Sequence, residues 1–127
     1  ASLRVDQSGV LSIGDKVFIN DNCNINCVNK ISIGEKTKIA SSVSINDHDH
    51  NFKNENNHLL IGEVCIGKNV WIGSNVVILK DTYIGDHSVI AAGSVVKGNI
   101  PESTIFMNKR ENEYRNILKP TRVKDAL

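Results

Sequence analysis

Aliphatic residues recur every six positions along most of the chain. The spacing holds in three runs, with a two-residue slip between the first and second, and the aliphatic positions are Ile13, Ile19, Ile25, Ile33, Ile39, Ile45, Ile66, Ile72, Ile78, Ile84, Ile90 and Val96. An amphipathic helix would place apolar residues three and four apart, and a half-buried strand would alternate them. A period of six instead predicts a short strand, a tight bend and another short strand, each with one aliphatic side chain pointing inward.

Two further positions repeat with the aliphatic residue. The residue directly after it is small or turn-forming, as at Gly14, Asn26 and Ala40, and we expect it to adopt the unusual torsions of a corner. Four positions after the aliphatic residue stands a small or β-branched side chain, at Val17, Cys23, Thr37, Val43, Val70, Val76, Thr82, Ser88 and Ser94. We expect these side chains to point inward as well.

Three such strands would complete a coil of about 18 residues, and coils would stack at the interstrand spacing of about 4.8 Å. Stacking buries a column of Ile and Val that no single repeat could bury alone. A sandwich of hairpins would need turn pairs such as Asn-Gly at regular spacing, and these are missing. The sequence therefore predicts one all-β domain over residues 1–127. Its repeats span about 10–100, a loop is inserted at about 46–63, and a tail over about 102–127 can form a short helix ending at Pro120.

Composition excludes several classes of protein. The 127 residues include 15 Lys and Arg against 14 Asp and Glu, a net charge of +1 that is unlike the basic excess of nucleic-acid binders. No apolar run approaches the roughly 20 residues of a membrane span, and the first ten residues do not resemble a signal peptide. Three cysteines are too few for a disulfide framework. We therefore expect a cytoplasmic protein without membrane insertion.

A polar segment interrupts the repeat between Ile45 and Ile66. These residues are 21 apart, three more than one 18-residue coil, and the segment NDHDHNFKNENNHLL lacks the inward aliphatic residue. It holds His48, His50 and His58, three of the four histidines. Loops on rigid scaffolds often carry function, and histidine suits general-base chemistry near neutral pH. Asp47 and Asp49 could orient an imidazole, bind an acceptor, or simply be solvated.

The stretch from Val64 to Pro101, VCIGKNVWIGSNVVILKDTYIGDHSVIAAGSVVKGNIP, resembles the hexapeptide-repeat acyltransferases, and in particular the sugar and capsule O-acetyltransferases. The resemblance covers about residues 13–101. It implies a left-handed parallel β-helix that assembles as a homotrimer. It also implies that acetyl-CoA, as co-substrate, and a carbohydrate acceptor meet in clefts between subunits.

The resemblance assigns roles to individual residues of the acceptor side. The family pattern IGxxxxIAxxVxIxxxxH fits from Ile33 to His50, so it implies that His50 is the catalytic base, with His48 in reserve. Trp71 matches a tryptophan that works with this histidine in capsule O-acetyltransferases, and an exposed Trp beside a cleft could also be a platform for the sugar or for the pantetheine arm of the cofactor. A lone Trp can also be packing at a subunit interface. Asn20 in FINDNC matches an asparagine that holds the acceptor, although it could equally be a bend residue.

The donor side is implied by small residues and by cations in the C-terminal part of the chain. Small residues at Gly73, Ser74, Ala91 and Ala92 would let the pantetheine arm approach the backbone, with Ser74 and Ala92 matching coenzyme A contacts in relatives. Basic residues that could meet its phosphates are Lys97, Lys109, Arg110 and Arg115. Relatives close the last coil with a segment like GxPAK, whereas this chain has STIFMNKRENEYR.

These assignments predict an acetyl-CoA-dependent O-acetyltransferase that modifies a sugar or surface polysaccharide by direct attack, with no covalent intermediate and no metal. Three alternatives remain open at the level of sequence. One is N-acetylation of an amino sugar, and another is a non-catalytic β-helix scaffold. The third is a zinc enzyme like the γ-class carbonic anhydrases, which need two histidines five residues apart, and no such pair exists here.

Overall fold

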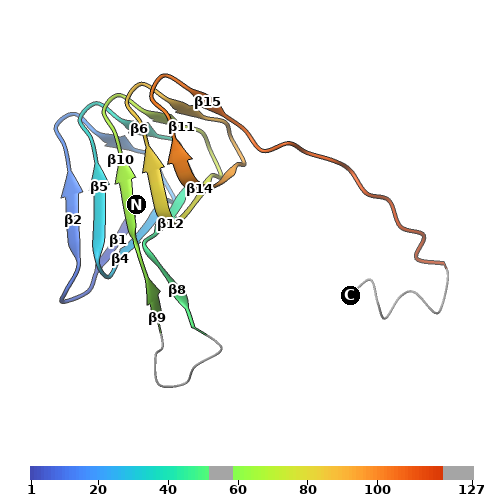
Figure 1. The fold of residues 1–127 in the computed structure, drawn as a ribbon, viewed down its shortest axis with the longest axis horizontal. Coiled ribbons are helices and arrows are strands. Elements are labelled where there is room, and N and C mark those ends of the chain that lie inside the picture. Colours follow the sequence, from blue (N-terminus) through green and yellow to red (C-terminus); the bar gives the residue numbers. More distant parts are fainter. Residues whose placement is uncertain (52–58, 119–127) are drawn as a thin grey trace.

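The computed structural model describes residues 1–51 and 59–118, which form strands joined by turns and contain no helix. The strands wind into a stack of coils, seen from the side in Figure 1. Their bounds are β1 Ser2–Val5, β2 Val10–Ile13, β3 Phe18–Ile19, β4 Asn24–Cys27, β5 Lys30–Ile33, β6 Lys38–Ile39, β7 Ser44–Asn46, β8 His48–His50, β9 Leu59–Ile61, β10 Glu63–Ile66, β11 Trp71–Ile72, β12 Val77–Ile84, β13 Val89–Ile90, β14 Val95–Ile100 and β15 Ile105–Phe106.

Each coil passes through three faces, and within each face the strands of successive coils pair in parallel. The first face consists of β1, β4, β7 and the N-terminal ends of β12 and β14. The second face consists of β2, β5, β10 and the C-terminal ends of β12 and β14, and it is turned toward the viewer in Figure 1. The third face consists of β3, β6, β11, β13 and β15. The chain passes through the three faces in turn, so the expected parallel β-helix is confirmed.

The register shows where coils depart from the regular length. Trp71 pairs with Val89, 18 residues away, as expected for a regular coil. Lys38 pairs with Trp71, which is 33 residues away, so this coil carries 15 extra residues. The expectation of only three extra residues was wrong. Ile45 and Ile66 lie on consecutive faces, where a six-residue step is normal, and not on the same face one coil apart.

The interior of the stack is the predicted aliphatic column. From Ile25 to Val96 the six-spaced residues are at most 3% exposed, and those four positions later are buried from Cys23 onward. Removing this apolar surface from water is the main stabilising contribution to such a fold. The first coil closes the column less completely, because Ile13 is 40% exposed.

The corners use two different residues for two different purposes. The left-handed torsion falls three positions after the aliphatic residue, for example at Lys36 with φ of 60°, and not directly after it as expected. The residue directly after it must be small for another reason. A Cβ atom on Gly34 would lie 2.5 Å from the carbonyl carbon and oxygen of Gly67 in the next coil. Close stacking of coils, and not backbone torsion, therefore selects glycine there.

The tail leaves the last coil as an extended segment (Figure 1). Residues 111–118 form no helix, which corrects the expectation of a helical tail for this part, while Pro120 lies outside the described residues. Tyr114, Ile117 and Leu118 are 89%, 74% and 83% exposed, so no packing surface stabilises a helix that would be marginal at this length. No helix with the length and apolar character of a membrane span occurs among the described residues.

Candidate functional site

At the corner between the first and second faces, the described part of the 15 extra residues forms an antiparallel hairpin. Its strands are β8 and β9, paired from His48 with Ile61 to His50 with Leu59. Figure 1 shows the hairpin extending away from the stack. The inserted segment thus emerges at one corner of the third coil, and both candidate histidines of the described residues lie on its first strand. His58 lies outside the described residues.

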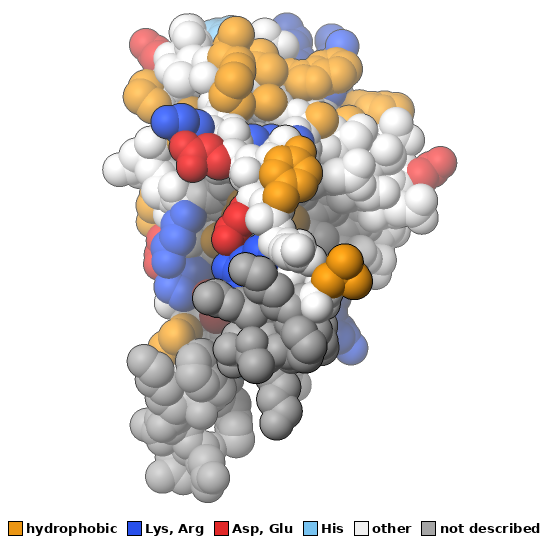
Figure 2. Space-filling model, turned by 90° about the vertical axis from the view of Figure 1, so that its right-hand side faces the viewer, with side chains coloured by type: hydrophobic (Ala, Val, Ile, Leu, Met, Phe, Trp, Pro, Cys, Tyr) orange, Lys and Arg blue, Asp and Glu red, His pale blue; other side chains and the backbone are white. Residues whose placement is uncertain are grey.

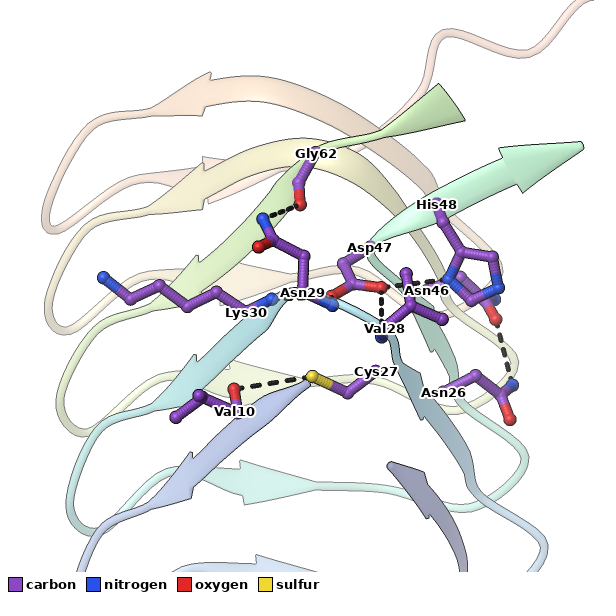
Figure 3. A network of polar contacts seen from close by, with 10 residues as sticks. All are labelled: Val10, Asn26, Cys27, Val28, Asn29, Lys30, Asn46, Asp47, His48 and Gly62. Carbon is purple, nitrogen blue, oxygen red and sulfur yellow. Dashed lines mark hydrogen bonds and ion pairs between the residues drawn. The ribbon is translucent and has the colours of Figure 1, made fainter. Parts of the chain in front are cut away.

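Asp47 anchors the base of this hairpin. Its side chain is fully buried, and its carboxylate accepts hydrogen bonds from the backbone N–H groups of Val28 at 3.0 Å, Asn29 at 2.8 Å and Lys30 at 2.8 Å (Figure 3). These three residues form the corresponding corner of the coil before. Asp47 therefore ties the start of the hairpin to the neighbouring coil.

His48 completes the hydrogen bonding of this carboxylate. Its Nδ1 lies 2.9 Å from Oδ1 of Asp47, and its side chain is 18% exposed. Burial alone would raise the pKa of Asp47, but the hydrogen bonds from Val28, His48, Asn29 and Lys30 outweigh it, so the pKa lies below its ordinary value. A carboxylate that stays ionised fixes the ring of His48 with a proton on Nδ1.

A polar pocket of about 550 Å³ lies beside the hairpin. Both His48 and His50 line it, and the remaining walls come from the first three coils and β9, namely Arg4, Asp6, Asn26, Cys27, Val28, Asn46 and Leu59. His50 is exposed, whereas the ring of His48 is mostly covered. The two candidate bases thus line one pocket, and of the two it is His48 that is hydrogen-bonded to the buried carboxylate of Asp47.

Sequence reasoning predicted only the two histidines of this pocket, and it missed the polar residues Arg4, Asp6, Asn26 and Asn46. Both asparagines directly follow an aliphatic residue of the repeat, the position expected to form the bend, and Arg4 and Asp6 precede the repeat. The signal that could have found them is the register of the first coils. Arg4 pairs with Asn26, which is 22 positions away, and Asn26 pairs with Asn46, which is 20 positions away because the two-residue slip lengthens the second coil.

Two acceptor candidates lie outside the pocket. Asp49 is exposed on β8. Asn20 lies at the corner between the third and first faces, where its Oδ1 accepts the N–H of Asp21 at 2.7 Å. In one chain, Asn20 is therefore at a different corner from the histidines.

The small residues proposed for the donor do come together, at this same corner between the third and first faces. The N–H of Gly93 donates to the carbonyl of Ser74 at 2.8 Å, and a Cβ on Gly73 would lie 2.6 Å from the nitrogen of Ala92. Arg110 joins them from the tail, because its Nη2 donates to the carbonyl of Ala92 at 3.3 Å. Ala91 adjoins this group in the chain.

The other donor candidates lie elsewhere. Lys97 is on β14, Lys109 pairs with Glu111 at 3.6 Å, and Arg115 pairs with Glu113 at 2.9 Å. Trp71 begins β11 on the third face and is 51% exposed. In a single chain, the histidine pocket and the group around Ser74 and Ala92 therefore occupy different corners.

The described residues hold no group of three or more His, Cys, Asp or Glu side chains arranged to bind a metal ion. All three cysteines are free, and Cys65 is the exposed one.

Part of the chain matches a known protein family. The family model described as bacterial transferase hexapeptide (six repeats) matches residues 66–98. This range begins at the last residue of β10 and ends within β14. It does not include the hairpin.

Two relatives from Escherichia coli K12 are similar over most of the chain. WbbJ, a candidate O-acetyl transferase of lipopolysaccharide biosynthesis, is 39% identical over an alignment of 118 residues that covers 82% of this chain and 60% of WbbJ. Galactoside O-acetyltransferase is 37% identical over 75% of this chain and 48% of that enzyme. The chain thus spans between about half and three fifths of the length of these relatives.

A solved structure shares the fold. The hexapeptide-repeat acetyltransferase VCA0836 from Vibrio cholerae O1 biovar eltor, solved with acetyl coenzyme A, superposes with a TM-score of 0.72 at 30% identity. The match covers 81% of this chain and 58% of that protein.

Proposed function

Because the chain belongs to the hexapeptide-repeat family of acetyltransferases, we propose that it transfers the acetyl group of acetyl-CoA to a hydroxyl of a sugar or surface glycan. In this proposal, residues 1–127 act as one acyltransferase domain. The observation that carries it is the hairpin, which Asp47 anchors and which presents two histidines to a polar pocket. The names of WbbJ and galactoside O-acetyltransferase support a sugar hydroxyl as acceptor.

His50 is the general base in this proposal. Its spacing fits the family pattern, and it is exposed in the pocket, where an acceptor and a donor can both reach it. His48 is less accessible, and its Nδ1 is engaged by Asp47. The pair of Asp47 and His48 is therefore a positioning element, which fixes β8 so that His50 points into the pocket.

The chemistry needs one base and a site for an oxyanion. His50 takes the proton of the acceptor hydroxyl as the oxygen attacks the thioester carbonyl. The tetrahedral intermediate then collapses, the carbon–sulfur bond breaks, and the thiolate of coenzyme A takes the proton back from the imidazolium. A backbone N–H near Trp71 or Ser74 would stabilise the oxyanion, and holding both substrates together lowers the barrier further.

Coenzyme A would lie along the corner that carries Gly73, Ser74, Ala91 and Ala92. Small side chains there leave the backbone accessible to the pantetheine amides. Arg110 is the favoured phosphate contact, because it already reaches Ala92. Lys97, Lys109 and Arg115 remain weaker candidates, since they lie away from this corner or pair with glutamates.

A second copy of the chain would complete the site. The histidine pocket and the donor corner are separate in one chain, so assembly must bring one copy's hairpin to the other's donor corner. The third face offers a surface for assembly, since Phe18, Trp71 and Ile105 are exposed in one register column. Figure 2 shows that hydrophobic side chains also gather along the top of the molecule. A homotrimer would form three equivalent sites.

The proposal is tested with the purified chain in three steps. Calorimetric titration of acetyl-CoA, with chelator present, should give saturable binding, and sedimentation equilibrium should give a trimer. Release of free coenzyme A should then depend on added methyl glycosides. A folded trimer that does not bind acetyl-CoA would refute the transferase. Acetylation of glucosamine at nitrogen only would replace the hydroxyl acceptor with an amine.

A further inference from the structure

A column of polar side chains leads from the histidine pocket toward the first coil. Arg4 on β1, Asn26 on β4 and Asn46 on β7 are successive register partners on the first face, and all three line the pocket. Adjacent coils are about 4.8 Å apart, so the column covers about 10 Å of backbone. It ends at Asn46, two residues before His48.

The two asparagines are fixed by each other. Nδ2 of Asn26 donates to Oδ1 of Asn46 at 2.9 Å, as Figure 3 shows. This arrangement leaves the side-chain oxygen of Asn26 and the side-chain NH₂ group of Asn46 available to a ligand. An acceptor and a donor group side by side suit the hydroxyls of a sugar.

Arg4 gives the far end of the column a positive charge. Its side chain is exposed, and it forms no ion pair with any carboxylate of the described residues. A guanidinium group presents its N–H donors in a planar fork, which matches a carboxylate or phosphate through two parallel hydrogen bonds. This group is therefore placed to bind an anion at the pocket wall.

We propose that the column of Arg4, Asn26 and Asn46 selects an acceptor that carries an oxyanion, a carboxylate or a phosphate. Arg4 would hold the oxyanion, the asparagines would hold sugar hydroxyls, and His50 would face the hydroxyl to be acetylated. This inference rests on the proposed function, and it narrows the acceptor from sugars in general to acidic sugars.

Asp6 is the charged residue that opposes this selection. It lines the same pocket, where its carboxylate would repel an anion. Asp6 makes no ion pair with Arg4, so it does not neutralise the guanidinium group. It also lines an adjoining hollow formed with Gln7, Ser8, Leu59 and Ile61. Because the carboxylate of Asp6 repels an anion in the pocket, removing it should strengthen anion binding.

The test compares three probes that share one ring. They are methyl glucoside, methyl glucuronide and the phosphate ester of the glucoside at the same carbon. Their affinities for the full chain, saturated with coenzyme A, are measured by nuclear magnetic resonance titration. The variants are Arg4→Gln, Arg4→Lys and Asp6→Asn, and Lys68→Gln removes one charge at another corner as the control.

The wild-type chain should bind at least one charged probe about tenfold more tightly than methyl glucoside, the size expected for a charged hydrogen-bonded contact. Arg4→Gln should abolish this difference, Arg4→Lys should reduce it, and Asp6→Asn should increase it. The charged probe that binds more tightly shows whether the site prefers a carboxylate or a phosphate. Equal affinities for the three probes, or a preference that Arg4→Gln leaves unchanged, would overturn the inference. Because binding is measured without turnover, a failed proposal for acetyl transfer would appear separately, in the coenzyme A release assay.

Discussion

The carboxylate of Asp47 lies 2.9 Å from Nδ1 of His48, and the same carboxylate accepts three backbone N–H groups of the preceding coil. One buried side chain therefore joins the hairpin to the stack. The geometry of the candidate site depends on this junction, since both histidines follow it directly.

Replacing Asp47 with Asn should destabilise the fold. An amide can accept hydrogen bonds with its oxygen but would turn its NH₂ group toward a backbone donor, and a buried donor without a partner costs about 1–3 kcal/mol. We expect a loss of about 2 kcal/mol in urea-induced unfolding. Asp49→Asn is the matched control, because Asp49 is exposed on the same hairpin. Equal stability of the two variants would argue against the anchor.

The same residue should shape the stability of the protein in acid. The pKa of Asp47 is lower in the folded state, so between its folded and unfolded values the unfolded chain binds more protons. Its stabilising contribution is complete above the ordinary value of about 3.9 and is lost as the pH falls through the lower, folded value. Urea midpoints measured from neutral pH to about pH 3 should fall less steeply in Asp47→Asn than in the wild type. Parallel curves would contradict this assignment.

Two substitutions in one corner separate close stacking from backbone torsion. Gly34→Ala should destabilise the fold by about 1–3 kcal/mol, because its Cβ would overlap Gly67 of the next coil. Lys36→Gly should be neutral or stabilising by less than about 1 kcal/mol, because it relieves a left-handed torsion at φ of 60° but frees the unfolded chain. Thermal or urea unfolding measures both. A neutral Gly34→Ala variant would contradict the role of close stacking, and a clear loss of stability in Lys36→Gly would contradict the role of torsion at that position.

The sequence was informative about everything that depends on periodicity. A six-residue repeat dictates which side chains point inward, so Ile72, Ile78 and Ile84 could be placed without a structure. The role of the corner residues was harder to predict, because a small residue in the sequence is equally consistent with an unusual backbone torsion and with close approach of the next coil. The pocket was harder still. Its partners Arg4 and Asn46 are 42 positions apart and meet only through the irregular lengths of the first coils.

Arg110 provides a test of the donor site. Its guanidinium reaches the carbonyl of Ala92 at the corner proposed for coenzyme A, whereas Arg115 pairs with Glu113 in the exposed tail. Arg110→Ala should therefore weaken acetyl-CoA binding about tenfold, the loss expected for a charge-assisted contact to phosphate. Arg115→Ala should change it less than about twofold. Calorimetric titration distinguishes the two, and an equal effect of both variants would show that the tail contributes only general charge.

The most direct test of the account compares kcat/KM for coenzyme A release in His50→Gln and His48→Gln. A general base contributes about 100- to 10,000-fold, so His50→Gln should lose at least about 100-fold. His48→Gln should lose less, about tenfold, because it only loosens the hairpin, and both variants should still bind acetyl-CoA. The opposite order would make His48 the base, oriented by Asp47. Activity within about twofold of wild type in both variants would contradict a catalytic role for the hairpin.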